Sequence, residues 1–247
     1  MRNIWTIAKR EYNHYFTSTI AYALAAGLLF MLGVAFAFIL SQASQYAGFG
    51  GPPPDVTQLN GFFAFLLVFI VPALTMRLMA DETRSGTIEL MLTSPVSDFE
   101  MVTGKWLGGL LFMLTIIAVT LIYPIILNFR IENGIDQVVM LTSYLGLILI
   151  AASFLALGTG ISTLFSNQLA AFFVTFFVLL TIWWLVSLPA GLMPSGGDFL
   201  RYLQVGSHYD YSFNAGSINL SDLIYFFSLI AMGLFTGSMA LESRRWR

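Results

Sequence analysis

The stretch Met76–Trp106, MRLMADETRSGTIELMLTSPVSDFEMVTGKW, is a charged island between two long apolar runs. Within it Gly86 interrupts the chain, and Thr87 can serve as the N-cap of a short helix. Glu89 would lie in the first turn of that helix, where a negative charge is favoured by the helix dipole. Pro95 ends the helix, because proline cannot continue the backbone hydrogen bonding. The island therefore predicts a helix of about two turns between two breaks.

One face of this short helix is apolar, since Ile88, Met91 and Leu92 follow the i, i+3, i+4 spacing. An apolar helix face of this kind suits insertion into a groove on another protein, although the same pattern also suits packing against the ends of the chain's own spans. Both interpretations stay open on the residues alone. The candidate docking helix consists of Thr87, Ile88, Glu89, Met91, Leu92, Ser94 and Pro95.

Composition predicts an all-α integral membrane protein. Of the 247 residues 57% are hydrophobic and only 10% are charged, and the mean hydropathy is +0.81, which is far above what a soluble domain needs. There is no cysteine, which excludes disulfides and cysteine metal sites. No basic tract with interleaved aromatic residues indicates nucleic-acid binding.

Residues 1–18 are amphipathic and predict a helix that lies in the membrane interface. Glu11 is the exception in the pattern, because it falls inside the apolar arc of the helical wheel. A carboxylate there is costly unless it reaches water or meets a basic partner. Our hypothesis for that partner is Arg77 or Arg84, which belong to the same side of the membrane.

Six uncharged or nearly uncharged runs are long enough to cross a bilayer as helices. A capping-box pattern at Ser97–Glu100 indicates that the helix of the third run begins before the run itself. The chain is predicted to be a single domain, 1–247, with an inner loop at 80–106. The six predicted spans are residues 20–40, 61–79, 107–128, 138–165, 169–188 and 223–241.

The segment 189–220 is neither a plain loop nor a span, and its mixed apolar and polar pattern predicts a short amphipathic or re-entrant helix. Non-helical backbone at membrane depth is tolerated only where it lines a cavity or is buried in protein. We expect this segment to form either an outer gate or a surface lid without a role in transport. The candidate gate residues are Phe199, Tyr202, Leu203, His208 and Tyr209.

Basic residues set the orientation. With six spans both termini lie on one side, and that side carries nine of the eleven Lys and Arg residues, with only Arg130 and Arg201 opposite. The positive-inside rule therefore predicts that both termini and the loop 80–106 are cytoplasmic.

The search for catalytic chemistry is negative. Lys105 follows Gly104, but the glycine and the Ser or Thr that a Walker P-loop needs are absent, so the chain is not expected to bind ATP. His14 and His208 are the only histidines and fall on opposite sides of the membrane, which disfavours a metal site. No charged residue stands at mid-span, which disfavours ion-coupled transport.

These residues together resemble the permease subunits of ABC type-2 transporters, over nearly the whole chain. The N-terminal Ala8–Glu11 is similar to the interfacial helix of that family. Ser207–Asp210 and Asp222–Phe226 resemble its gliding-motility branch, although Ala215 stands where that branch has Arg. The most specific motifs are Met76-Arg77-Leu78, Asp81-Glu82, Ser85–Glu89, Leu92–Asp98 and Gly104-Lys105.

The resemblance implies a bacterial inner-membrane subunit that binds no cofactor itself. Two copies of a cytoplasmic ATPase, which bind ATP and Mg, would dock on the short helix. A second permease chain, identical or related, would complete the path, and an outer-side auxiliary protein is possible. Ion pairs between the interfacial helix and the loop are implied among Glu11, Arg77, Asp81, Glu82, Arg84 and Lys105.

The transported substrate, if there is one, is not readable from the residues, because the outer loops carry no charge cluster that selects a chemical class. The family architecture is compatible with export and with mechanical work on an outer-side partner. Two functions from other classes stay open. One is a membrane scaffold that recruits a cytoplasmic partner, and the other is a channel or secondary transporter.

Overall fold

A computed structural model describes residues 2–47, 53–80, 82, 96–132, 134–193 and 196–245. In these ranges the chain is helical and contains no strand, which confirms the all-α class. The helices are α1 Arg2–Thr17, α2 Thr19–Ala47, α3 Val56–Thr75, α6 Asp98–Thr120, α7 Ile122–Arg130, α8 Gln137–Leu164, α9 Gln168–Trp183 and α12 Leu220–Arg245. Between α9 and α12 lie the short elements η1 Leu185–Leu192, α10 Gly197–Tyr202, α11 Val205–Asp210 and η2 Phe213–Ala215.

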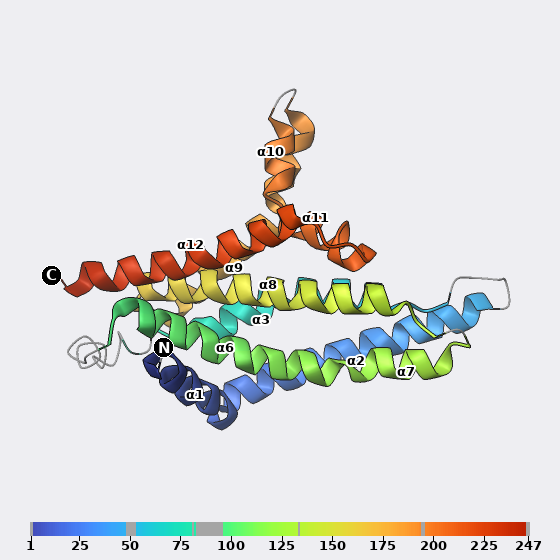
Figure 1. Ribbon diagram of the computed structural model, residues 1–247, viewed down its shortest axis with the longest axis horizontal. Coiled ribbons are helices and arrows are strands. Elements are labelled where there is room, and N and C mark those ends of the chain that lie inside the picture. Colours follow the sequence, from blue (N-terminus) through green and yellow to red (C-terminus); the bar gives the residue numbers. More distant parts are fainter. Residues whose placement is uncertain are drawn as a thin grey trace.

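The long helices run side by side as one bundle, and α1 crosses it at the end where the chain also terminates (Figure 1). Helix α8 is central, because it packs against α3, α6, α9 and α12. Two glycines allow the closest of these crossings: a Cβ atom added at Gly160 would collide with the backbone carbonyl of Gly233.

Among the residues that the structure describes, five helical stretches are long and apolar enough to cross a membrane: Thr19–Tyr46, Val56–Thr75, Asp98–Arg130, Gln137–Leu164 and Leu220–Ser243. They contain all or most of the predicted spans 20–40, 61–79, 107–128, 138–165 and 223–241. The predicted span 169–188 is different, since its α-helix has only 16 residues and ends at Trp183. Trp184 leaves the helical conformation (φ −146°, ψ −42°) and a 3₁₀ segment that contains Pro189 follows. Proline lacks the N–H that would continue an α-helix.

Capping side chains fix several helix starts. The predicted capping box of α6 is present, because the Glu100 N–H donates to Ser97 Oγ at 3.2 Å and the Ser97 N–H donates to Glu100 Oε2 at 3.3 Å. The side chains of Asp136 and Asn167 cap α8 and α9 by accepting from backbone N–H groups of the first turn, without the reciprocal contact of a capping box. Helix α6 therefore begins nine residues before the predicted span 107–128 and contains Lys105.

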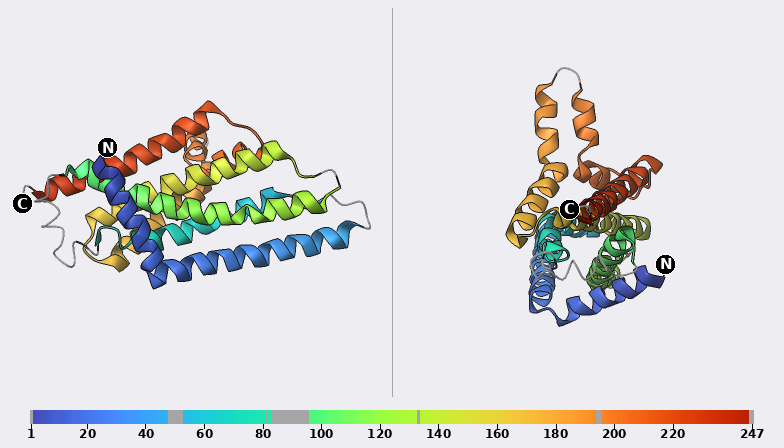
Figure 2. Two further views of the ribbon diagram at one scale, coloured as in Figure 1. Left: turned by 60° about the horizontal axis from the view of Figure 1, so that its bottom comes forward. Right: turned by 90° about the vertical axis from the view of Figure 1, so that its left-hand side faces the viewer.

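The elements η1 and α10 form a short hairpin, which we call the arm (Leu185–Leu192 and Gly197–Tyr202), and it stands away from the bundle (Figures 1 and 2). The two legs pack closely, because a Cβ atom at Gly197 would lie 2.5 Å from the carbonyl oxygen of Ala190. After the arm, α11 and η2 return to the bundle and pack against α8. The predicted segment 189–220 thus consists of a projecting part and a buried part.

Candidate functional site

Helix α1 lies directly on α6 because two glycines of α6 leave room for it. A Cβ atom at Gly104 would lie 2.8 Å from the Cβ atom of Ile7, and one at Gly108 would lie 2.6 Å from the Cβ atom of Glu11. Both distances are too short for real side chains, so only glycine permits this approach. The packing brings Glu11 to within bonding distance of Lys105, which lies between the two glycines.

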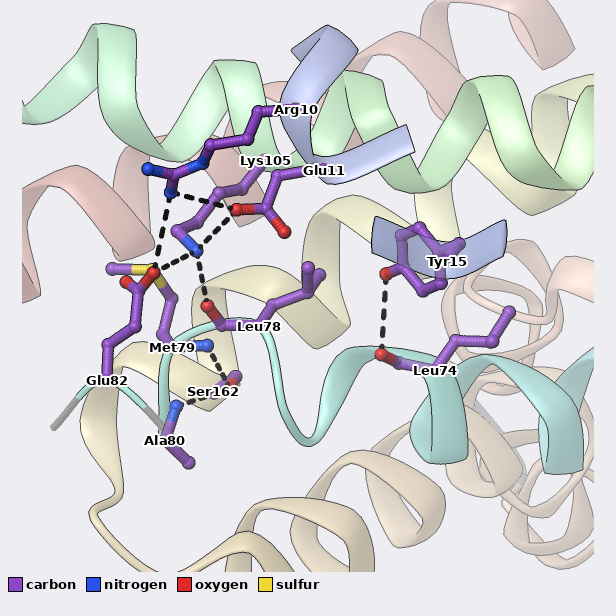
Figure 3. A network of polar contacts seen from close by, with 10 residues as sticks. All are labelled: Arg10, Glu11, Tyr15, Leu74, Leu78, Met79, Ala80, Glu82, Lys105 and Ser162. Atoms are coloured by element: carbon purple, nitrogen blue, oxygen red, sulfur yellow. Dashed lines mark hydrogen bonds and ion pairs between the residues drawn. The ribbon is translucent and has the colours of Figure 1, made fainter. Parts of the chain in front are cut away.

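Lys105 is the centre of a buried polar cluster. Its side chain is 2% exposed, and its Nζ atom donates to Glu82 Oε1 at 2.7 Å, to the carbonyl oxygen of Leu78 at 2.8 Å and to Glu11 Oε1 at 3.1 Å. A lysine ammonium has three N–H donors, so all three are used. These contacts connect α6 to α1 and to the segment that follows α3 (Figure 3).

Glu11 was expected to meet Arg77 or Arg84, and for Arg77 this is wrong. In the described ranges the partners of Glu11 are Lys105 and Arg10, whose Nη2 atom lies 3.3 Å from Glu11 Oε1, whereas Arg77 is exposed. Burial raises the pKa of Glu11, but the ammonium of Lys105 and the neighbouring guanidinium outweigh burial, so the pKa lies below its ordinary value. Asp81 and Arg84 lie outside the described residues.

The segment after α3 is also held by α8. Ser162 Oγ accepts hydrogen bonds from the backbone N–H groups of Met79 and Ala80, both at 3.3 Å. One turn earlier, the hydroxyl of Tyr15 donates to the carbonyl oxygen of Leu74 at 3.4 Å (Figure 3). We call the group Glu11, Leu78, Glu82, Lys105 and Ser162 the polar junction.

The polar junction adjoins both sides of the stretch 83–95, which lies outside the described residues together with all seven docking-helix candidates, Thr87, Ile88, Glu89, Met91, Leu92, Ser94 and Pro95. Before the stretch, Glu82 is bound to Lys105. After it, Glu100 Oε2 accepts from Asn3 Nδ2 at 3.2 Å, which ties the start of α6 to α1. Helices α1 and α6 therefore anchor the chain on each side of 83–95.

Four of the five gate candidates separate into two groups, and the half-buried Leu203 lies between them at the end of α10. Phe199 and Tyr202 belong to the arm, where their side chains are exposed, while His208 and Tyr209 are buried against the bundle. Tyr202, Leu203 and His208 meet through contacts with α12, in which Asp222 and Tyr225 take part. Sequence analysis placed both residues in the motif Asp222–Phe226 but did not assign them to the gate candidates.

Comparison with known proteins agrees with this architecture. Residues 5–236 match the family model described as ABC-2 family transporter protein. The chain is 30% identical over 119 residues, 47% of its length and 42% of the relative's, to the probable ABC transporter permease protein NosY of Stutzerimonas stutzeri. It is 33% identical over 113 residues, 45% of its length and 40% of the relative's, to the protein with the same description from Pseudomonas aeruginosa. The chain thus matches about two fifths of the length of these curated relatives.

Proposed function

The chain belongs to the ABC-2 family of transporter proteins, and from this premise we propose that it is the membrane permease subunit of an ATP-driven complex. The observation that carries the proposal is the polar junction. It binds the segment before the stretch 83–95 to α1, α6 and α8, which include two membrane-spanning helices, and the separate Asn3–Glu100 contact ties the start of α6, after the stretch, to α1. A push on that stretch would thus act on the helices through buried ionic contacts.

In this proposal the chain hydrolyses nothing itself. Two copies of a cytoplasmic ATPase subunit bind ATP and Mg and dock on the helix predicted at Ile88–Ser94. A second permease chain, identical or related, lies beside this one in a bacterial inner membrane, with both termini cytoplasmic. Lys105 is the main link in transmission, because it joins three separate segments through one buried ammonium.

The work done by such a complex is either export or a mechanical action on an auxiliary protein outside the membrane. The arm projects sideways from the long helices (Figure 1) and its Leu192 side chain is 87% exposed, so it supports a contact with a neighbouring chain beside the bundle. Membership of the gliding-motility branch is a finer part of the proposal and rests on the resemblance of Ser207–Asp210 and Asp222–Phe226.

Two single substitutions in the docking helix test the proposal. Leu92→Asp places a carboxylate on the predicted apolar face, and Thr93→Asp is the matched control because the periodicity places Thr93 off that face. A buried unpaired carboxylate costs several kcal/mol, so we expect a co-purifying ATPase to be lost with Leu92→Asp and kept with Thr93→Asp. A partner without ATPase activity that responds in the same way would indicate a scaffold instead. Equal recovery of the ATPase with both variants would refute docking through this face.

A further inference from the structure

A histidine connects the arm, the return segment and the last helix. His208 lies in α11, and its side chain is 7% exposed. Its Nδ1 atom lies 2.7 Å from Asp222 Oδ1 in α12, and its Nε2 atom lies 2.6 Å from the carbonyl oxygen of Tyr202 at the end of the arm. Both ring nitrogens are therefore engaged, and each contact joins a different element.

The chemistry of the two contacts fixes the number of protons. A backbone carbonyl only accepts, so Nε2 must carry a proton. A carboxylate also only accepts, so the contact between Nδ1 and Oδ1 requires a second proton, carried by the ring or by the carboxyl group. The second oxygen of Asp222 already accepts from Asn219 Nδ2 at 3.1 Å. The pair thus needs one proton more than a neutral imidazole beside an ionised carboxylate.

Aromatic side chains enclose this contact. The ring of Tyr225 stacks on that of His208 with centroids 4.1 Å apart, and the Tyr225 hydroxyl donates to the carbonyl oxygen of Leu203 at 2.7 Å. Tyr202 meets the imidazole edge to face at 4.9 Å. The ionisable groups that face the ring are therefore Asp222 and Tyr225 from α12 and Tyr202 from the arm.

Three other charged residues of the arm and α11 do not take part in this contact. Arg201 in the arm is exposed and lies 3.5 Å from the exposed carboxylate of Asp198. Asp210, two residues after His208 in α11, is exposed. The bridging contacts of the described chain at His208 are thus those with Asp222 and Tyr202.

We propose that His208 and Asp222 form a proton-dependent clasp that holds the arm to the last helix. With the shared proton present, the end of the arm, α11 and α12 are bonded together. When a rise in pH removes one proton, the neutral ring donates from only one nitrogen, so a lone pair faces either the carboxylate of Asp222 or the carbonyl oxygen of Tyr202, and that contact becomes repulsive. The arm then moves more freely relative to the bundle. Histidine commonly changes charge between about pH 5 and 8. The proposed clasp does not depend on what the complex transports or acts on.

A proton-dependent clasp predicts different pH responses for two substitutions, Asp222→Asn and His208→Gln, whereas a simple packing contact predicts no such difference. In Asp222→Asn the amide oxygen can accept from Asn219 while the amide nitrogen donates to Nδ1 of a neutral ring. That arrangement satisfies every group without the shared proton, so the variant should stay clasped at all pH values. His208→Gln cannot bridge both partners and should stay open.

The absence of cysteine from the chain makes a spin-label experiment simple. One label is placed at Leu192→Cys in the arm and the other at Leu141→Cys in α8, both exposed positions. Distances between the labels are measured by pulsed electron resonance on the full chain at about pH 5 and about pH 9, on either side of the histidine range. A control pair at Leu141→Cys and Phe129→Cys avoids the arm.

We expect the distance distribution of the arm pair to be narrow at low pH and to broaden at high pH, while that of the control pair is unchanged. Asp222→Asn should be narrow at both pH values and His208→Gln broad at both. A distribution that is the same at both pH values in the unmodified clasp would overturn the proposal, as would an Asp222→Asn variant that broadens with pH. If His208→Gln does not fold, Asp222→Asn and the unmodified clasp still decide between these outcomes.

Discussion

Replacing Lys105 by methionine tests the polar junction most severely. Methionine keeps most of the side-chain volume and removes the ammonium, so the substitution deletes three contacts without opening a large cavity. Among the described residues, the contact left to Glu11 is then that with the exposed Arg10, and the carbonyl of Leu78 loses the ammonium donor. Glu82 loses its 2.7 Å ion pair as well.

The expected magnitude follows from burial. Because Lys105 is 2% exposed and Glu11 is 8% exposed, removal of the ammonium leaves carboxylates with little access to water. Removal of one partner from a buried ion pair costs about 3–5 kcal/mol. For a chain of this length 1 kcal/mol corresponds to roughly 2–4 °C in Tm, so we expect a fall on the order of 10 °C.

The assay is thermal unfolding of the purified chain in detergent, with Lys9→Met as the matched control. Lys9 is an exposed lysine of α1, so its loss removes the same charge without desolvating a partner and should change the Tm little. Adding Glu11→Gln to Lys105→Met should recover at least about 1 kcal/mol, since contacting residues couple. Equal Tm values for the Lys105 and Lys9 variants would refute the assignment of Lys105 as the centre of the junction.

Three further predictions follow from the same region. Gly108→Ala should destabilise the chain by about 1–3 kcal/mol, because its Cβ atom would lie 2.6 Å from that of Glu11, whereas Gly27→Ala, with open space around it, should not, as thermal unfolding would show. Ser162→Ala should cost about 1–3 kcal/mol in the free energy of unfolding, because it removes the hydroxyl that accepts from the backbone N–H group of Ala80, and the exposed Ser44→Ala is its control. Because the pKa of Glu11 is lowered, its stabilisation is present above the ordinary carboxyl pKa and is lost as pH falls through the lowered value; a Tm series in acid should show this loss, and Glu11→Gln should remove it.

Local signals predicted the helices well. Both hydrogen bonds of the predicted capping box at Ser97–Glu100 are present. This prediction succeeded because a capping box depends only on residues three positions apart. Of the six predicted spans, five lie wholly or mostly in span-length helices of the described chain, because hydropathy along the chain is also a local signal. The run 169–188 was predicted too long, since hydropathy does not register the change of backbone at Trp184 that ends α9 before Pro189.

Partners distant in sequence were harder to predict. The helical wheel correctly indicated that Glu11 needs a basic partner, but it could not choose Lys105 over Arg77. Lys105 is the partner of Glu11 because α1 crosses α6 at Gly104 and Gly108. The sequence signal for this contact was a lysine that lies between two glycines four residues apart. The clasp between His208 and Asp222 was missed because it forms only when the arm returns to the bundle.

The most direct test of the account is to purify the tagged full chain in a mild detergent, identify its stable partners and assay ATP hydrolysis after reconstitution into a bilayer. The account predicts a stoichiometric ATPase whose hydrolysis is stimulated by the chain and weakened by Lys105→Met far more than by Lys9→Met. Recovery of the chain alone, moving solute across liposomes without ATP, would contradict it and would establish a channel or secondary transporter.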